Sequence, residues 1–246
     1  MTNWSIESLN PVQRKIVEHK SGPALVIAGA GSGKTRVITH RVAELIQTGI
    51  PASSILLLTF TNKAANEMAQ RVGRALKNQT EQQKIIHGTF HSVGSRFLRR
   101  NAKLLNYKNN FSILDSSDSR DLIKASMAET IGKPGKYFPK AAVLQNIFSL
   151  AFNRFSTQQM ILDSAYHERN FHLEQLLSAD YPHFSENTET ILKVLSTYRR
   201  KKKRGQVMDF DDLLENWLEL LLRNGEGLPL FRQIQYILVD EYQDTN

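Results

Sequence analysis

The chain alternates short apolar runs with longer segments in which apolar residues recur every three or four positions. Ala24–Ala28 (ALVIA) and Ile55–Phe60 (ILLLTF) are short runs of the kind found in strands buried on both faces. Lys84–His87 (KIIH) is a weaker third run, and Tyr236–Val239 (YILV) is a fourth near the end of the chain. These runs predict the strands of one sheet.

Helical patterns separate the first strands. After the first run, apolar residues at positions 37, 38, 42, 45 and 46 have helical spacing, and Gly49 stands where that helix should end. Further helices are expected from about Asn62 to Leu76 and from about Ser92 to Leu105. Strands that alternate with helices are typical of a parallel sheet with right-handed crossovers. The predicted fold class is therefore α/β, with a parallel sheet flanked by helices.

The middle of the chain has a different pattern. From about Asp115 to Arg204 it shows helical periodicity and no convincing strand, beginning with an N-cap at residues 116–118. Helices are expected at about 116–130, 141–153, 157–165, 172–179 and 187–204. We interpret residues 115–205 as an all-helical subdomain inserted into an α/β domain made of residues 1–114 and 206–246. A second, independent helical domain is the alternative.

Composition and charge restrict the class of protein. A chain of 246 residues suits one large domain or one domain with an insertion. With 32 Lys and Arg against 24 Asp and Glu, the net charge is +8, which fits either a polyanion partner or a merely basic protein. The absence of cysteine excludes disulfides, thiolate metal sites and cysteine nucleophiles. No signal pattern or membrane-length apolar run is present, so we expect a cytoplasmic location and no membrane partner.

A glycine-rich turn between the first run and the first helix matches the Walker A phosphate-binding pattern, with alanine at its first position. Small residues let backbone N–H groups surround phosphate oxygens, and the helix that follows presents its positive end to the same anion. Lys34 supplies a cation for the β- and γ-phosphates, and Thr35 a hydroxyl for Mg²⁺. The segment reads Ala28-Gly29-Ala30-Gly31-Ser32-Gly33-Lys34-Thr35.

A carboxylate pair at the end of the last strand completes this prediction. Asp240 and Glu241 follow the apolar run Tyr236–Val239 directly. Asp240 would hold Mg²⁺, and Glu241 would orient or deprotonate the water that attacks the triphosphate. Together with the phosphate turn, the pair predicts a Mg·ATP site with Lys34, Asp240 and Glu241 as its catalytic residues.

The set of motifs resembles superfamily 1 helicases of the UvrD/Rep/PcrA type. Leu9–Gln13 looks like the Q motif of that family, and the phosphate turn is similar to its Walker A motif. Thr59–Ala65, followed by Met68, looks like motif Ia, and Asp240–Asn246 looks like motif II. Further segments that resemble the family are Gly88-Thr89-Phe90-His91-Ser92 and Asp209-Phe210-Asp211-Asp212-Leu213.

The resemblance implies a RecA-like motor domain that is interrupted by a helical subdomain. It implies that Gln13 reads the adenine edge and that Arg36 and Gln243 also contact the nucleotide. It also implies that single-stranded DNA crosses the carboxyl edge of the sheet, where an exposed aromatic residue can stack on a base. The candidate DNA-binding residues are Thr59, Phe60, Thr61, Asn62, His91 and Arg96. A core position for Phe60 and a structural role for His91 remain the alternatives.

Two charged segments leave their roles open. Arg199–Arg204 is a run of six basic residues that could contact DNA phosphates or simply form a solvated helix end before Gly205. Asp209, Asp211 and Asp212 could suggest a metal, but the leucine face behind them favours the start of a helix with acids in its first turn.

The last motif coincides with the end of the sequence, so we expect a fragment of a longer helicase. Its partners would be single-stranded DNA, duplex junctions and a second RecA-like domain of the same parent chain. Alone it should bind nucleotide and single strands weakly and hydrolyse ATP slowly or not at all. A module that binds nucleic acid or protein under ATP control is the alternative, and another P-loop enzyme, such as a kinase or GTPase, is disfavoured because no NKxD-type guanine reader is visible.

Overall fold

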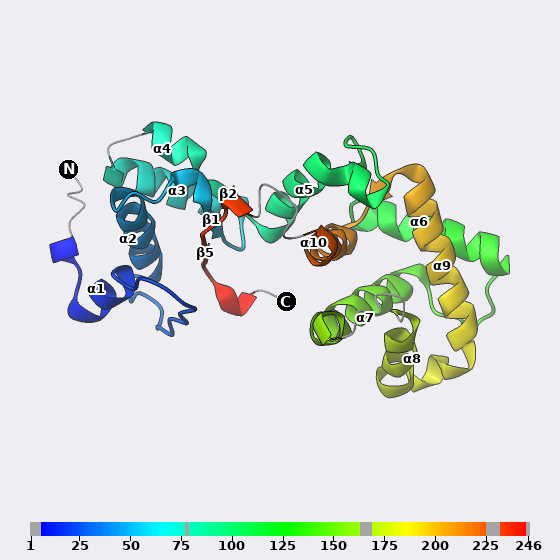
Figure 1. The fold of residues 1–246 in the computed structure, drawn as a ribbon. Coiled ribbons are helices and arrows are strands. Elements are labelled where there is room, and N and C mark those ends of the chain that lie inside the picture. The colour runs from blue at the N-terminus through cyan, green and yellow to red at the C-terminus, as the bar shows by residue number, and fades with distance from the viewer. Residues whose placement is uncertain (1–5, 77–78, 163–168, 225–231, 245–246) are drawn as a thin grey trace. The chain divides into compact units, whose positions relative to one another are not determined.

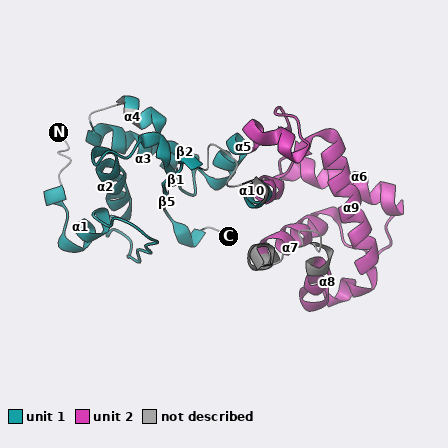
Figure 2. Cartoon of the chain, in the orientation of Figure 1, with its two compact units in different colours: residues 1–97, 218–245 teal, residues 98–217, 246 magenta. Residues whose placement is uncertain are grey.

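The structure is a computed structural model that describes residues 6–76, 79–162, 169–224 and 232–244. The chain divides into two compact units, shown in two colours in Figure 2. Unit 1 contains Met1–Phe97 and Leu218–Thr245, and unit 2 is built from Leu98–Trp217. Two distant stretches of sequence therefore form unit 1.

Unit 1 contains a three-stranded parallel sheet in the order β2-β1-β5. Its strands are β1 (Ile55–Leu58), β2 (Ile86–Gly88) and β5 (Tyr236–Val239). All four residues of the central strand β1 are buried, as its continuous apolar run predicts. Leu57 pairs in register with His87 on one side and Leu238 on the other. The mixed α/β class with a parallel sheet is thus confirmed.

Helices α2, α3 and α4 lie beside this sheet (Figure 1). Residues of α2 and α3 pack with β1 in one core, which includes Val42, Leu45, Ile55, Leu57 and Met68. Four helices lie wholly in unit 1: α1 (Pro11–Val17), α2 (Lys34–Gln47), α3 (Asn62–Leu76) and α4 (Gln79–Lys84). Two more, α5 (Phe90–Asn101) and α10 (Phe210–Asn224), are shared with unit 2. Short 3-10 helices lie at Ile6–Ser8, Ala52–Ser54 and Tyr242–Asp244.

The prediction of a strand at Ala24–Ala28 is wrong. These residues form no strand, and the side chains of Leu25 and Ile27 are 73% and 90% exposed. An apolar run favours burial, but a strand also needs a neighbouring backbone to pair with, and here both the burial and the pairing are absent. Within the described sheet, β1 pairs with β2 and β5, and neither β2 nor β5 pairs with this segment.

Unit 2 is mainly helical. Its helices pack around a core that includes Ile123, Leu144, Leu177, Ile191 and Tyr198. The elements are a 3-10 helix at Ala102–Leu105, β3 (Ser112–Ile113), α6 (Ser116–Ile131), α7 (Ala141–Leu162), α8 (Arg169–Asp180), a 3-10 helix at Pro182–Asn187, α9 (Thr188–Gly205) and β4 (Val207–Met208). The unit also contains the last residues of α5 and the first part of α10.

Several details of unit 2 differ from the predictions. β3 and β4 form a two-residue parallel ladder that the sequence did not indicate. Asp115, one residue before the expected N-cap, caps α6 by accepting from the backbone N–H groups of Ser117 and Asp118 at 2.7 and 2.8 Å. α7 continues through Leu162 where a new helix was expected at 157, and the remainder of that expected helix lies partly outside the described residues.

Candidate functional site

The carboxyl ends of the three strands in unit 1 meet at one edge of the sheet. The backbone N–H of Asp240 donates to Leu58 O (2.9 Å), and that of Thr59 donates to Gly88 O (3.1 Å). These bonds continue the strand ladders one residue past the strands. Open parallel sheets bind ligands at this edge. The acidic pair after β5 and the segment after β1 are therefore neighbours at the edge where a ligand is expected.

The phosphate turn is an exposed loop that leads into α2. Its two left-handed residues are Gly31 (φ 75°) and Gly33 (φ 87°), a conformation that residues with a Cβ rarely adopt. The hydroxyl of Ser32 donates to Gly29 O at 2.8 Å and tightens the turn. Gly33 is the N-cap of α2, so the backbone N–H groups of the first turn of α2 point toward this loop.

Thr35 and Asp240 are in contact although 205 residues separate them. The hydroxyl of Thr35 donates to Asp240 Oδ2 at 3.4 Å. Asp240 is only 6% exposed, and burial raises the pKa of its carboxyl above the usual value. A hydroxyl and a carboxylate are oxygen ligands of the kind Mg²⁺ prefers, and Mg²⁺ commonly binds few protein groups beside waters and phosphates. These two residues therefore fit a magnesium ion.

Lys34 folds back over its own loop. Its ammonium donates to Ala28 O at 3.2 Å and to Gly29 O at 3.3 Å. The cation thus lies against the backbone that would surround a phosphate. A triphosphate in the loop would offer the ammonium charged oxygens in place of these carbonyls.

Glu241 has a left-handed backbone conformation, with φ 53°. Its N–H donates to Asp240 Oδ1 at 3.1 Å, and Gln243 Nε2 donates to its Oε2 at 2.5 Å. A non-glycine residue in this region is uncommon and costs on the order of 1 kcal/mol, so it is retained where the surroundings enforce it. In this conformation the carboxylate of Glu241 lies on the turn immediately after Asp240.

Comparison with known proteins now decides the family. The UvrD/REP helicase N-terminal domain family matches residues 9–246, which is nearly the whole chain. The chain belongs to the UvrD/REP helicase family.

Relatives agree with that assignment. The ATP-dependent DNA helicase PcrA of Bacillus subtilis (strain 168) is 37% identical over 248 residues, which cover 100% of this chain and 31% of the relative. PcrA of Staphylococcus aureus (strain Mu50 / ATCC 700699) is 35% identical over 246 residues, covering 99% of this chain and 31% of the relative. PcrA of Leuconostoc citreum is 35% identical, covering 98% and 30%. The chain therefore spans less than a third of the length of these relatives.

Gln13 and Arg36 lie beside the phosphate turn of this UvrD/REP domain. Gln13 Nε2 donates to Ser32 O at 3.0 Å. Arg36, in the first turn of α2, donates to the hydroxyl of Ser8 at 2.8 Å and to its carbonyl at 3.2 Å. Both residues thus connect the segment around α1 to the loop and helix of the phosphate site.

The segment after β1 presents an aromatic side chain to solvent. Phe60 is 65% exposed, so the core alternative for it does not apply in this structure. Thr59 is only 2% exposed, and its side chain lies inside the unit. Thr61 accepts from the N–H of Ala64 at 3.1 Å and so caps α3, whose first residue, Asn62, is exposed.

His91 and Arg96 lie on α5, after β2. His91 is half-buried, and Arg96 donates to the carbonyl of His87 at 2.5 Å. His87 also contacts the side chain of Asn66 at 3.2 Å. The sequence did not single out His87 or Asn66, because their contact depends on how α3 packs beside β2.

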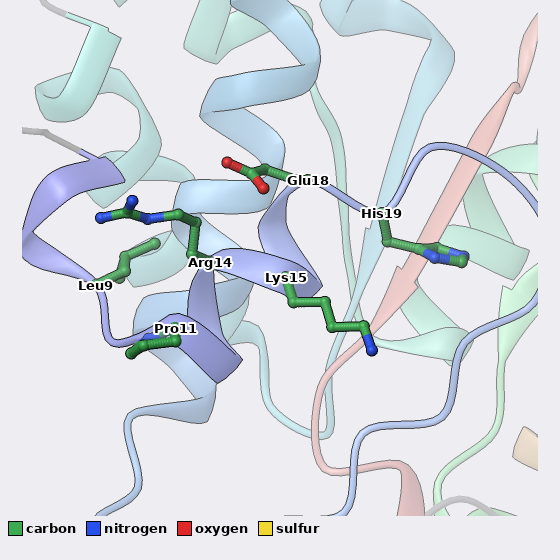
Figure 3. A pocket seen from close by; sticks show the side chains of 6 residues that line it. All are labelled: Leu9, Pro11, Arg14, Lys15, Glu18 and His19. Atoms are coloured by element: carbon green, nitrogen blue, oxygen red, sulfur yellow. The ribbon is translucent and has the colours of Figure 1, made fainter.

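An open hollow of about 490 Å³ lies on α1 (Figure 3). Its lining side chains diverge from one another and include none of the phosphate turn. We assign it no role in the site. Its lining is Leu9, Pro11, Arg14, Lys15, Glu18 and His19.

The basic run at the end of α9 is largely engaged within unit 2. Arg200 and Lys201 pair with Glu129 at 2.5 and 2.7 Å. Lys203 donates to the carbonyl of Leu105. Lys202 is buried and pairs with the aspartates at the start of α10, as Lys202–Asp209 (2.6 Å) and Lys202–Asp212 (2.7 Å). The run therefore ends the helix as expected, but Arg200, Lys201 and Lys202 are ion-paired within the unit rather than simply solvated.

The aspartates near residue 210 begin a helix, as their leucine-rich context predicts. Asp209 accepts from the N–H of Asp212 at 2.8 Å, and Asp212 accepts from the N–H of Asp209 at 3.0 Å. No cluster of three metal-ligating side chains occurs among the described residues. In the same part of the chain, no helix is both long and apolar enough to cross a bilayer.

Proposed function

We propose that this chain is the N-terminal motor domain of an ATP-dependent DNA helicase and binds Mg·ATP in unit 1. The observation that carries the proposal is the contact between Thr35 and Asp240 at 3.4 Å. It joins the phosphate turn to the acidic strand end, the two segments that any Mg·ATP site of this kind requires. Membership of the UvrD/REP family and the name of the PcrA relatives support the same activity.

The roles of the residues follow from their chemistry. Bound ATP would replace the carbonyl partners of Lys34, and the loop N–H groups of residues 29–35 would surround its phosphates. Thr35 and Asp240 would hold Mg²⁺, whose positive charge would stabilise negative charge on the phosphate oxygens. Glu241 would orient the attacking water, with Gln243 holding its carboxylate. Gln13 and Arg36 would contact the nucleoside.

Single-stranded DNA would cross the carboxyl edge of the same sheet. Exposed Phe60 is suited to stack on a base, a contact worth roughly 1–3 kcal/mol. Thr61, Asn62 and the N-terminus of α3 would hold phosphates, and His91 and Arg96 lie on the neighbouring helix α5. Thr59 is buried beneath this surface, so its contribution would be to support the segment that carries Phe60. Since nucleotide and DNA would share one edge, hydrolysis could be coupled to movement along the strand, which we propose to be from 3′ to 5′.

The domain organisation is part of the proposal. Residues 1–114 and 206–246 would form the RecA-like domain, and residues 115–205 a helical insertion. Because the chain spans 31% of the length of its PcrA relatives, we propose that a second RecA-like domain completes the ATP site. An arginine from such a domain can be worth roughly 10³–10⁵ in rate. On its own, the chain should therefore hydrolyse ATP very slowly.

Two measurements test the function. In the first, Mg·ATP affinity is measured for the chain and for Lys34→Ala, which should bind far more weakly while keeping its circular dichroism spectrum. Equal affinities would refute the phosphate site. In the second, ATP hydrolysis by the full-length protein is measured with and without single-stranded DNA. A motor should be strongly stimulated, whereas a module that only binds under ATP control should be indifferent.

A further inference from the structure

Both polar atoms of the Gln13 side chain are engaged within the protein. Its Oε1 accepts from the N–H of Asn10 at 3.2 Å, and the Gln13 N–H donates to Asn10 Oδ1 at 2.8 Å. This reciprocal pair is a capping box at the start of α1. The other polar atom, Nε2, donates to Ser32 O at 3.0 Å, across 19 positions of sequence. Gln13 thus links the start of α1 to the phosphate turn.

Packing between α1 and α2 fixes the place of Gln13. Leu9 and Val17 are buried against Val37 of α2 in a small core of their own. Polar contacts reinforce it at both ends of α1. The guanidinium groups of Arg36 and Arg41 reach back to Ser8 (2.8 Å) and to Val17 O (2.6 Å). The bond from Gln13 to the turn is therefore built on a supported helix and not on a free side chain.

The bond to Ser32 O determines which way one peptide group faces. A trans peptide is planar, so its C=O and the N–H of the next residue point in opposite directions. When Ser32 O points toward Gln13, the N–H of Gly33 points away from Gln13. Gly33 has φ 87°, and a Cβ placed on it would come within 3.1 Å of Gln13 Nε2. The side chain of Gln13 therefore lies directly against this peptide group.

We propose that Gln13 is a positioning residue for the phosphate turn, distinct from any contact it makes with the base. By holding Ser32 O, it keeps the Gly33 N–H directed into the loop, where the phosphates of ATP would lie. The inference rests on the proposed Mg·ATP site. It assigns Gln13 a contribution to binding that does not depend on adenine.

Inorganic tripolyphosphate, which has no base, tests this role. Its affinity in the presence of Mg²⁺ is measured by calorimetry for the chain and for Gln13→Met, whose side chain has similar length but neither donor nor strong acceptor. Loss of one hydrogen bond that orients the loop should weaken tripolyphosphate binding by about three- to tenfold. The ATP affinity should fall at least as much.

Two further variants separate the link to the turn from the helix cap. Asn10→Ala removes the side chain that caps α1 but leaves Gln13 Nε2 in place, so tripolyphosphate affinity should remain within about twofold. Gln13→Asn keeps a polar amide but is one methylene too short to reach Ser32 O. It should therefore lose the same affinity as Gln13→Met, and it serves as a second variant in case the methionine variant fails to fold.

Each outcome bears on a different claim. If Gln13→Met and Gln13→Asn lose ATP affinity but bind tripolyphosphate as tightly as the unaltered chain, Gln13 only reads the base and the inference is wrong. If Asn10→Ala loses as much tripolyphosphate affinity as they do, the effect comes from the cap of α1 and the inference also fails. If the unaltered chain binds neither ligand, the proposed function fails first and the inference fails with it.

Discussion

Replacing the buried Lys202 with methionine should destabilise unit 2 strongly. The ammonium of Lys202 lies 2.6 Å from Asp209 and 2.7 Å from Asp212, and all three side chains are nearly inaccessible to solvent. Tyr198 donates its hydroxyl to Asp209 at 2.7 Å, and its ring lies 4.4 Å from the ammonium. The lysine joins the end of α9 to the start of α10. Methionine keeps its apolar length and removes only the charge.

The size of the effect follows from the two carboxylates that lose their cation. Removing one partner of a buried ion pair typically costs about 3–5 kcal/mol, because a charge is left buried and unpaired. The total stability of a domain is only about 5–15 kcal/mol, so much of it should be lost. We expect the free energy of unfolding of unit 2 to fall by about 3–5 kcal/mol near neutral pH.

The loss should depend on pH in a defined direction. Burial raises the pKa of the Asp212 carboxyl above its usual value. Burial also opposes ionisation of Asp209, but Lys202, with the N–H of Asp212 and the hydroxyl of Tyr198, holds the pKa of the Asp209 carboxyl below its usual value. Such a group stabilises the fold above its unfolded pKa, and the stability is lost as pH falls through the folded pKa. Without Lys202, burial and the neighbouring carboxylate would raise the pKa instead, and acid would relieve the repulsion. The difference in unfolding free energy between the two proteins should therefore shrink as pH falls from neutrality.

Trp217 provides a local signal for this measurement. It is a buried residue of α10, five positions after Asp212, and one of two tryptophans in the chain. In a Trp4→Phe background, its fluorescence would report urea unfolding of the part of unit 2 around α10. Lys201→Met is the matched control: it removes an ion pair whose partner, Glu129, remains in solvent, so it should change stability little.

Two results would refute this reasoning. The first is a Lys202→Met protein that is no less stable than Lys201→Met at pH 7, because the buried cation would then have no special value. The second is a stability difference that stays constant or widens toward acid pH, because the carboxylates would then not be the source of the loss.

Three further predictions concern other residues. Phe60→Ala should weaken binding of a single-stranded oligonucleotide by about 5- to 150-fold at fixed salt in a fluorescence anisotropy titration, and unchanged affinity would remove this residue from the DNA surface. Thr35→Val should lower the ratio of ATP affinities with and without Mg²⁺, whereas an equal loss in both conditions would argue against a magnesium ligand. Asp115→Ala should cost unit 2 about 1 kcal/mol in urea unfolding followed by Trp217, since it removes the N-cap of α6. Asp118→Ala, an acid in the first turn of the same helix that makes no cap, should cost less.

Local patterns predicted the bounds of some elements closely. β5 begins and ends at the predicted residues, and so does α3, because each has a complete pattern within a few turns. The meeting of Thr35 with Asp240 was expected from the pairing of a phosphate turn with an acidic strand end, and the two side chains do meet although no strand precedes the turn. The site could therefore be assembled from its motifs without knowing any distance.

The failures concern residues whose state depends on distant partners. Leu25 and Ile27 are apolar enough for a buried strand, yet strand formation depends on a neighbouring backbone that no local pattern specifies. The contact of Gln13 with Ser32 depends on how α1 packs against α2. One miss is local instead: Asp115 and Ser116 are both good N-caps, and the backbone geometry at the helix start selects the aspartate.

The positive charge of the chain also has to be assigned to particular places. A net charge of +8 and a run of six basic residues suggest a surface for DNA, but a side chain that is paired within the protein has little attraction left for a phosphate. Arg200 and Lys201 form ion pairs with Glu129, and Lys202 forms ion pairs with Asp209 and Asp212. The run therefore stabilises unit 2, and the affinity that we propose for single strands should rest on the carboxyl edge of the sheet in unit 1. Neutralising the exposed Arg204 should accordingly change single-strand affinity and its salt dependence little. Phe60→Ala should lower that affinity more than the Arg204 variant does.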